Sequence, residues 1–130
     1  MQLINIIRDV SEDAKRDRIY LPLDDLARWG ISEEDVKSGE ALRQHPGWAP
    51  FVEEYLERAD GYRQRAFKLL GHLDKSARYS PAAMASFYQS IMAKISKKKG
   101  DVFSERIQLS KTEKILLAGY VYVRYRFFGF

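Results

Sequence analysis

A row of amide and carboxylate side chains near the N-terminus has the spacing needed to hold a cation. Asn5, Asp9 and Asp13 are four residues apart, and Gln2 precedes Asn5 by three. Four residues turn an α-helix through about 400°, so these side chains lie one above another on a single face. Carboxylates four residues apart repel each other, and a bound cation would remove that repulsion. Magnesium is the natural candidate, because it prefers oxygen ligands and is commonly shared between carboxylates and phosphates.

The same spacing is also compatible with an ordinary solvated helix face. Asp9, Asp13 and Asp17, with Arg8 and Arg16 nearby, could be ordinary surface charge. Asparagine is a poor choice for an exposed helical position, however, so Asn5 in register with two aspartates favours the binding interpretation. The other faces of this segment carry aliphatic side chains that would pack against a core: Leu3, Ile4, Ile6, Ile7 and Val10.

Composition narrows the chemistry further. The chain has 130 residues, 45% of them hydrophobic and 31% charged, which is typical of one globular domain. It contains no cysteine and only two histidines, His45 and His72, to which we assign no role. Disulfides, thiolate catalysis and cysteine-held metals are therefore excluded, and a metal would need oxygen ligands. No nicotinamide cofactor can be assigned. We recognise no signal peptide and no apolar run long enough to span a membrane, so we expect a cytoplasmic chain.

Charge is divided unevenly along the chain. Residues 1–60 have a net charge of −6 and residues 61–130 a net charge of +10. Two such halves could pack face to face, or they could clamp an anion with metal ions on the acidic side. Nucleic-acid binding is the weakest interpretation. Arg124 and Arg126 alternate with tyrosines, but no recognised nucleic-acid motif accompanies them, and we expect no nucleic-acid partner.

Hydrophobic spacing and helix-breaking residues predict an all-α chain folded as one unit over residues 1–130. Capping residues are expected at Ser32, at Ser80 before Pro81, and in the capping box from Ser110 to Glu113. Residues 101–109 are expected to be a connector. The expected helices cover residues 1–16, 24–29, 33–38, 48–75, 80–96 and 110 to the C-terminal end. The aromatic residues of the last helix are expected in a core or at an interface: Tyr120, Tyr122, Tyr125, Phe127 and Phe128.

The residues around the polar row form a longer pattern. Residues 2–22 read Gln2-Leu-Ile-Asn5-Ile-Ile-Arg8-Asp9-Val-Ser-Glu12-Asp13-Ala-Lys-Arg-Asp-Arg18-Ile-Tyr20-Leu-Pro22. This segment resembles the second aspartate-rich motif of the squalene/phytoene synthase family, approximately Q-x-x-N-I-x-R-D-x-x-E-D-x-x-x-x-R-x-Y-x-P, with its spacing intact. Residues 24–29 and 103–111 resemble later parts of the family more loosely.

The resemblance implies an isoprenoid-synthase-like helical bundle that condenses two prenyl diphosphates head to head with magnesium. Clustered metal ions neutralise the leaving diphosphate, and the allylic cation then needs a dry apolar cavity. By the family pattern, Asn5, Asp9 and Asp13 would hold two or more Mg²⁺ ions together with the substrate diphosphate. The resemblance also suggests site-lining or catalytic roles for Gln2, Tyr20 and Tyr88. Substrate-binding roles follow for Arg8, Arg18, Arg106 and Lys111, with Lys114 a further candidate.

Simpler structural roles remain open for several of these residues. Arg18 could pair with Glu12 or Asp13 instead of a diphosphate. Tyr20 and Tyr88 could be core aromatics with satisfied hydroxyl groups. The lysines at 97–99 are interpreted as a solvated helix end.

The chain also departs from the family pattern. Family members carry a first aspartate-rich motif on an earlier helix, and no segment here matches it, so the chain resembles the C-terminal half of such an enzyme. We therefore expect little or no turnover by this chain alone. Its expected partners are a prenyl diphosphate and either the missing N-terminal half or another copy of the chain, with at most peripheral membrane contact. The alternative is a non-catalytic, self-associating helical remnant that binds a lipid or a protein partner.

Overall fold

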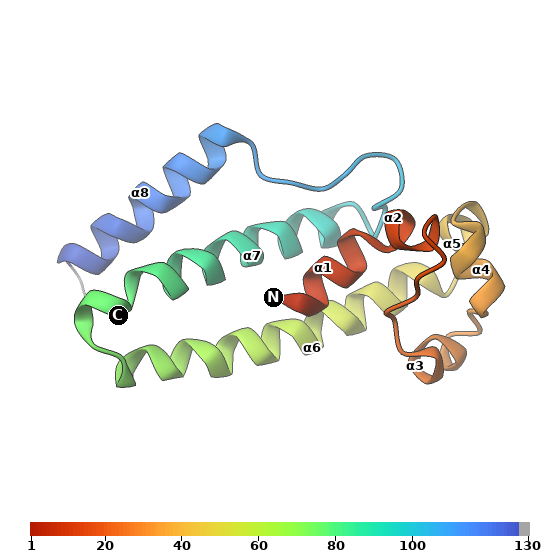
Figure 1. Ribbon diagram of the computed structural model, residues 1–130, viewed down its shortest axis with the longest axis horizontal. Helices are drawn as coiled ribbons and strands as arrows, with labels where there is room; N and C mark the ends of the chain where they lie inside the picture. The colour runs from red at the N-terminus through yellow and green to blue at the C-terminus, as the bar shows by residue number, and fades with distance from the viewer. Residues whose placement is uncertain (128–130) are drawn as a thin grey trace.

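The computed structural model describes residues 1–127, and every regular element in that range is helical (Figure 1). This confirms the all-α prediction. Two 3₁₀ turns, Leu70–His72 and Lys75–Ala77, join the two longest helices. The α-helices are α1 (Gln2–Arg8), α2 (Val10–Ala14), α3 (Leu23–Arg28), α4 (Glu33–Ser38), α5 (Glu40–Gln44), α6 (Trp48–Leu69), α7 (Tyr79–Lys97) and α8 (Lys111–Phe127).

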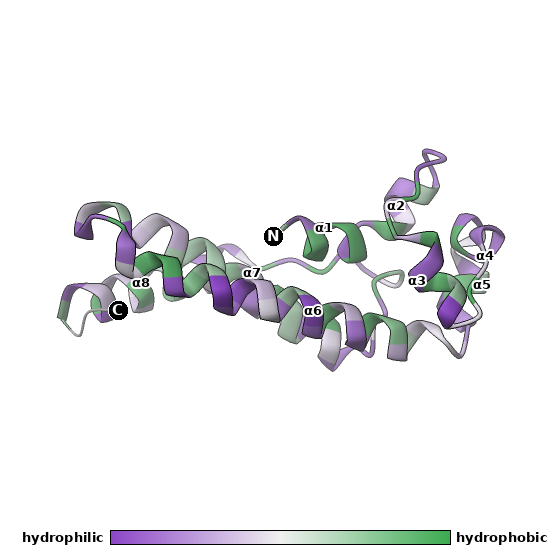
Figure 2. Cartoon of the chain, turned by 90° about the horizontal axis from the view of Figure 1, so that it is seen from below, coloured by the Kyte–Doolittle hydropathy of each residue, from purple (hydrophilic) through white to green (hydrophobic). Residues whose placement is uncertain are grey.

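The long helices α6 and α7 form the frame of the molecule. α1 contacts both of them, and α8 packs along α7 (Figure 1). The short helices α2 to α5 gather at the end of the frame where α6 begins (Figure 1). Figure 2 shows α1 as largely hydrophobic, whereas hydrophobic and hydrophilic residues alternate along α6. The difference in hydrophobicity follows from packing, because α1 packs against α6 and α7 while α6 keeps one face in solvent.

A main core fills the end of the frame near α1 and the short helices. Ile7, Leu26 and Leu42 are completely buried there, together with Trp48 and Phe51 of the first turn of α6. The indole Nε1 of Trp48 donates a hydrogen bond of 2.9 Å to the carbonyl oxygen of Gly100. The start of α6 is thereby fastened to the end of α7.

A second, smaller cluster joins the helices at the opposite end. Its buried members are Leu70, Ala82, Ala83 and Val121, and Phe67 and Tyr79 pack against it. The hydroxyl of Tyr79 donates to the carbonyl oxygen of Ala118 at 3.2 Å, which ties α7 to α8. The frame therefore has two separate apolar contacts, one at each end.

Several predicted helix ends are confirmed in detail. α4 begins with a capping box between Ser32 and Asp35 and ends at Gly39, which has φ +65°. At the start of α8, the backbone N–H of Ser110 donates to Glu113 at 2.7 Å, and the N–H of Glu113 donates to the Ser110 hydroxyl at 3.1 Å. Both boxes satisfy N–H groups that the first helical turn leaves unpaired.

Two predicted helix ends are wrong. The first helix was expected to reach Arg16, but α2 ends at Ala14 and the regular backbone is interrupted at Asp9 (φ −101°, ψ 9°). The turn that follows holds Asp17 at φ +54°, a left-handed conformation that cannot continue a helix. The helix expected to reach Lys75 ends at Leu69 and continues only as 3₁₀ turns.

The predicted N-cap of α7 is also wrong. Ser80 and Pro81 lie inside the first turn, because the helix begins at Tyr79 with Arg78 as its N-cap. The guanidinium of Arg78 donates to the carbonyl oxygens of Leu73 at 2.8 Å and Gly71 at 3.1 Å. These bonds brace the turn between α6 and α7 and set where α7 starts.

The aromatic residues of α8 are mostly outside the core. Val121 is the buried residue of this helix, whereas Tyr120 and Phe127 are 60% and 72% exposed, so a core position is wrong for both. Tyr122 and Tyr125 lie beside Tyr79, with ring centroids 6.0 and 6.5 Å away. Phe128 lies outside the described residues. Within residues 1–127, no helix is both long and apolar enough to cross a membrane.

Candidate functional site

The interruption at Asp9 leaves the polar row in register. The backbone N–H of Asp9 donates to the carbonyl oxygen of Asn5 at 2.9 Å, and that of Asp13 donates to Asp9 at 2.9 Å. Helical hydrogen bonds four residues apart therefore persist across the break between α1 and α2. Ile4 and Ile7 are buried and hold α1 against the frame. The sequence prediction that Asn5, Asp9 and Asp13 follow one another at helical spacing agrees with this backbone.

Asn5 brings an unsatisfied oxygen to the row. Its amide Nδ2 donates to the hydroxyl of Tyr88 on α7 at 3.3 Å. Its Oδ1 is buried and accepts no hydrogen bond from the described residues. Buried carbonyl oxygens are nearly always paired, and an unpaired one is destabilising. An oxygen of this kind is a fitting ligand for a hard cation.

Asp9 is held by two arginines. Arg8 forms a two-pronged ion pair, with Nε 2.8 Å from Oδ1 and Nη2 2.6 Å from Oδ2. Arg106, from the connector before α8, reaches Oδ1 at 3.4 Å and Glu12 at 3.8 Å. The hydrogen bonds from Arg8 are the main reason that the pKa of Asp9 is lowered, and in return Asp9 raises the pKa of Arg8. Asp9 is thus ionised, and its charge is compensated by guanidinium groups.

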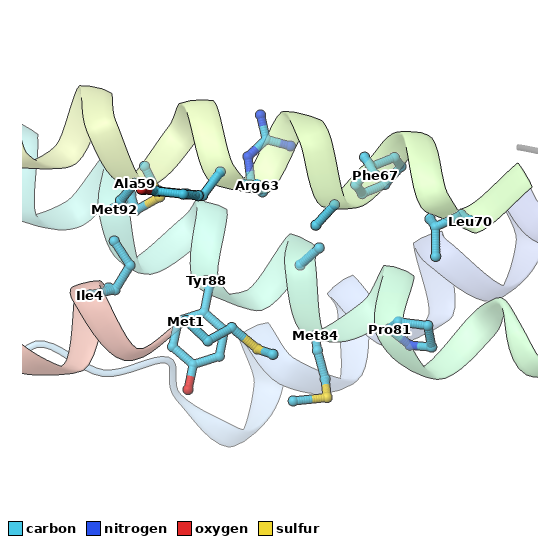
Figure 3. A pocket seen from close by; sticks show the side chains of 13 residues that line it. Met1, Ile4, Ala59, Arg63, Phe67, Leu70, Pro81, Met84, Tyr88 and Met92 are labelled. Atoms are coloured by element: carbon cyan, nitrogen blue, oxygen red, sulfur yellow. The ribbon is translucent and has the colours of Figure 1, made fainter. Parts of the chain in front are cut away.

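An apolar cavity of about 380 Å³ lies between α1, α6 and α7 (Figure 3). It occupies the gap between the main core and the second cluster. All three methionines of the chain line it. Its complete lining is Met1, Ile4, Ala59, Tyr62, Arg63, Ala66, Phe67, Leu70, Pro81, Met84, Ala85, Tyr88 and Met92. The cavity is therefore almost entirely hydrophobic, with one cation, Arg63, which Asp60 holds at 2.6 Å.

A cationic recess of about 400 Å³ lies next to this cavity. Its lining consists of Arg8, Phe87, Tyr88, Ile91, Arg106, Gln108, Leu109 and Lys114. Tyr88 belongs to both linings, so the apolar cavity and the cationic recess meet at its ring. The arrangement suits a molecule with an apolar tail and an anionic head group.

The remaining predicted site residues are dispersed at the surface. Gln2, Arg18, Tyr20 and Lys111 are exposed and line neither space. Arg18 makes no side-chain ion pair with the described residues, so its expected pairing with Glu12 or Asp13 is absent; Glu12 pairs with Arg106 instead. Tyr20 is 53% exposed, which rules out the core alternative for it. Lys114, one turn further along α8, reaches the recess where Lys111 does not.

Metal ligation would depend on the amide of Asn5. Within residues 1–127, no three acidic or histidine side chains gather closely enough to bind a metal ion. The side chain of Asp13 makes no hydrogen bond or ion pair within the same range. The available ligands are one buried amide oxygen and two carboxylates at helical spacing. Oxygen ligands of these types are the ones that magnesium prefers.

Sequence reasoning found Tyr88 and expected an apolar cavity, but it did not identify the other residues that line it. Most residues of its lining are on α6 and α7, and three of them are alanines: Ala59, Ala66 and Ala85. Small side chains at positions where the helical pattern calls for large ones leave space between two helices. Alanines at apolar positions of the helical pattern were the signal for a cavity that the sequence contained.

Comparison with known proteins gives consistent results. The profile of the squalene/phytoene synthase family matches residues 1–113. Phytoene synthase 2, chloroplastic, from Zea mays is 37% identical over 123 residues, which cover 95% of this chain and 30% of that protein. Phytoene synthase, chloroplastic, from Cucumis melo is 38% identical over 120 residues, covering 92% and 28%. Phytoene synthase 2, chloroplastic, from Solanum lycopersicum is 35% identical, covering 95% and 39%.

The chain therefore spans well under half of the length of these relatives. The region matched by the family profile contains the polar row, Tyr88 and the residues of the cationic recess other than Lys114. Because the family profile extends over most of the chain and the identity exceeds one third, this chain belongs to the squalene/phytoene synthase family.

Proposed function

We propose that this chain supplies one wall of the active site of a magnesium-dependent prenyltransferase. The reaction is the head-to-head condensation of two farnesyl or geranylgeranyl diphosphates in squalene, carotenoid or hopanoid biosynthesis. One observation carries the proposal: Tyr88 joins the apolar cavity, the cationic recess and the amide of Asn5. The similarity to phytoene synthases supports it.

Each part of the site has a role in this chemistry. The cavity would bury the apolar tail and keep water from a reactive allylic cation. Arg8, Arg106 and Lys114 would bind the diphosphate through charge-assisted hydrogen bonds. The hydroxyl of Tyr88 lies where head and tail meet and would fix how far the tail enters the cavity.

The polar row would hold the metal. Asn5 Oδ1 and the carboxylates of Asp9 and Asp13 are its oxygen ligands in this proposal. Magnesium bound there would supply the positive charge that makes diphosphate a better leaving group. Asp9 already binds Arg8 and Arg106, so a cation must compete with two guanidinium groups. We therefore expect weak magnesium affinity in the absence of a diphosphate.

We expect little or no turnover by the 130-residue chain alone. Metal ions that neutralise a diphosphate are usually held from more than one side, and the polar row provides one side. The second wall would come from a partner, either a further half of the enzyme or another copy of this chain. Robust formation of a squalene-like or phytoene-like product by the pure chain would contradict this part of the proposal.

Calorimetric titration with a non-hydrolysable farnesyl diphosphate analogue, with and without magnesium, tests the proposal. The analogue is expected to bind only when magnesium is present. The double variant Asp9→Asn and Asp13→Asn is expected not to bind the analogue, with or without magnesium. The control is Asp24→Asn, which removes an exposed carboxylate on α3 far from the row. Absence of any binding, or binding that is indifferent to magnesium, would count against a working half site.

A second candidate function has its own supporting observation. Ile115 and Leu116 of α8 are 71% and 68% exposed, which is unusual for large aliphatic residues on a packed helix. A helical unit with such a face could associate with itself and bind a lipid without catalysis. Magnesium-independent binding of the analogue, unchanged by the two Asp→Asn substitutions, would favour this candidate.

A further inference from the structure

A second basic recess, of about 500 Å³, adjoins the cationic recess. It lies between the C-terminal end of α7 and the connector that turns back toward α8 (Figure 1). Lys94, Lys97 and Lys98 line it, and it is called the lysine recess below. Arg106 and Gln108 of the connector line both recesses. The two spaces therefore meet at the connector.

Cations outnumber carboxylates on the walls of the lysine recess. Among the described residues that line it, Glu105 is the one acid, against three lysines and Arg106. Lys97 makes no hydrogen bond or ion pair with any residue of the described range, so its charge is available to a ligand. A solvated helix end is a sufficient interpretation only for Lys99, which is exposed and lines neither recess.

Glu105 is a partner that an anion can replace. It forms an ion pair with Lys98, and the hydrogen bond from Lys98 is the main reason that the pKa of Glu105 is lowered. The Glu105 side chain is 71% exposed, and exposed ion pairs contribute little stability. Lys94 is held more firmly, because it pairs with Glu113 at 2.7 Å and donates to the carbonyl oxygen of Gln108 at 3.1 Å. An incoming anion therefore displaces Glu105 from Lys98 and meets Lys94 as a fixed wall.

We infer that the lysine recess binds inorganic diphosphate after it has left the prenyl substrate. The inference rests on the proposed function, in which carbon–oxygen bonds break and their electron pairs leave with inorganic diphosphate. Before that step the diphosphate lies against Arg8, Arg106 and Lys114 in the cationic recess. The side chain of Arg106 is 52% exposed and reaches Asp9 at 3.4 Å and Glu12 at 3.8 Å. A freed diphosphate passes along Arg106 into the lysine recess without losing contact with a cation.

The lysine recess suits the freed anion better than it suits the substrate. Tyr88 joins the cationic recess to the apolar cavity, but no described residue lines both the lysine recess and that cavity. A prenyl diphosphate bound by the lysines would leave its apolar tail in water, which is unfavourable. The expected ligand is therefore a small polar anion, and its binding does not use the oxygen ligands of the polar row.

Calorimetric titration of the full 130-residue chain with inorganic diphosphate, in EDTA and without magnesium, tests the inference. Lys97→Gln combined with Lys98→Gln should weaken binding by about tenfold or more, because charge-assisted hydrogen bonds are lost. Glu105→Gln should strengthen binding by about two- to fivefold, because Lys98 loses a competing partner. Lys99→Gln is the matched control: it removes the neighbouring exposed lysine, which lines neither recess, and should leave the affinity unchanged.

The outcomes separate this inference from the proposed function. Circular dichroism confirms that each variant folds. If the double variant binds inorganic diphosphate as tightly as Lys99→Gln does, the inference is wrong, and magnesium-dependent binding of the farnesyl analogue still supports the proposed function. Lysine-dependent binding of inorganic diphosphate by a chain that binds no farnesyl analogue would support the diphosphate site and contradict the proposed function. Lysine-dependent binding to phosphatidic acid vesicles, with no binding of inorganic diphosphate, would assign the recess to a lipid head group and overturn the inference.

Discussion

Asn5 and Tyr88 are 83 residues apart in the chain, and their contact links the polar row to the cavity. Nδ2 of Asn5 donates a hydrogen bond to the Tyr88 hydroxyl, and Oδ1 stays unpaired. The hydrogen bond therefore also orients the unpaired oxygen. A neighbouring hydroxyl that accepts from the amide thereby fixes which atom of Asn5 is offered to a ligand. The orientation of this side chain is set by α7 rather than by its own helix.

Tyr88→Phe should destabilise the chain by about 1 kcal/mol, because the partly buried amide of Asn5 loses its hydrogen-bond acceptor. Urea denaturation followed by circular dichroism measures the change in the free energy of unfolding. Tyr20→Phe is the control, since Tyr20 is 53% exposed and makes no hydrogen bond with the described residues. Equal effects of the two substitutions would show that the Asn5–Tyr88 bond contributes nothing specific.

The sequence alone predicted the row but not the two-pronged ion pair between Arg8 and Asp9. Side chains at i and i+4 share a helix face, and that rule placed Asn5, Asp9 and Asp13 together. The same rule places adjacent residues on different faces, so it gave no reason to pair Arg8 with Asp9. Their ion pair forms where Asp9 departs from helical dihedral angles (φ −101°, ψ 9°). A departure from helical dihedral angles at a single residue depends on tertiary packing. The spacing of residues in the sequence does not reveal it.

At the scale of the elements, the end of α7 depends on a glycine. Gly100 has φ +77°, and a Cβ there would lie 3.1 Å from Val52 Cγ2 and 3.3 Å from Trp48 Nε1. Gly100→Ala should therefore destabilise the chain by about 1–3 kcal/mol. Gly119→Ala is the matched control on the exposed side of α8, where nothing lies within 4 Å; it should stabilise by about 0.5–1 kcal/mol. Chemical denaturation distinguishes these opposite signs, and a neutral Gly100→Ala would contradict the strain argument.

The attachment of α8 should depend on pH through Glu113. Lys94 of α7 pairs with Glu113 at 2.7 Å and also donates to the carbonyl oxygen of Gln108, so one lysine joins α7, the connector and α8. This pairing and the bonds from Ser110 lower the pKa of Glu113 from 4.5 to about 2. A lowered pKa in the folded state stabilises the chain above the unfolded value, and this stabilisation disappears as the pH falls from 4.5 toward 2.

Thermal unfolding across this acid range tests the dependence. Glu113→Gln should lower the melting temperature at neutral pH and should flatten its decline between about pH 4.5 and 2. Glu57→Gln is the control, because Glu57 is an exposed acid on α6 that pairs with no described residue. If the Glu113→Gln variant follows the same acid profile as the unsubstituted chain, the ion pair does not stabilise α8.

Element boundaries were predictable where a capping box marks them, but not at Ser80, where a lone capping residue precedes a proline. The boxes at Ser32 and Ser110 were found because a hydroxyl and a carboxylate three residues apart satisfy the first turn locally. The end of α6 was missed because Leu70 and Leu73 continue the helical spacing. The turn after the helix is held by side-chain bonds from Arg78 to the carbonyl oxygens of Gly71 and Leu73, which helical spacing does not reveal.

At the scale of the whole molecule, the cavity could not be inferred from any one segment. It exists because α6 and α7 are joined by two apolar clusters and held apart between them. Each cluster contains residues from distant parts of the chain, so the separation of the helices appears only in the assembled fold. The family resemblance predicted that an apolar site exists, and the structure shows that α1, α6 and α7 form it.

The exposed face of α8 leads to a prediction about association. Ile115, Leu116 and Phe127 are each more than two-thirds exposed, and α8 buries Val121 as its single fully buried residue within the described range. Large exposed aliphatic and aromatic side chains are stabilised by contact with another surface, so the chain should self-associate as its concentration rises. Sedimentation velocity should show this, and Ile115→Glu with Leu116→Glu should shift the population toward monomer. The matched control introduces two glutamates on the exposed side of α7, at Gln89 and Ala93, and should leave association unchanged. A chain that stays monomeric at every concentration would show that this face has no affinity for a second copy.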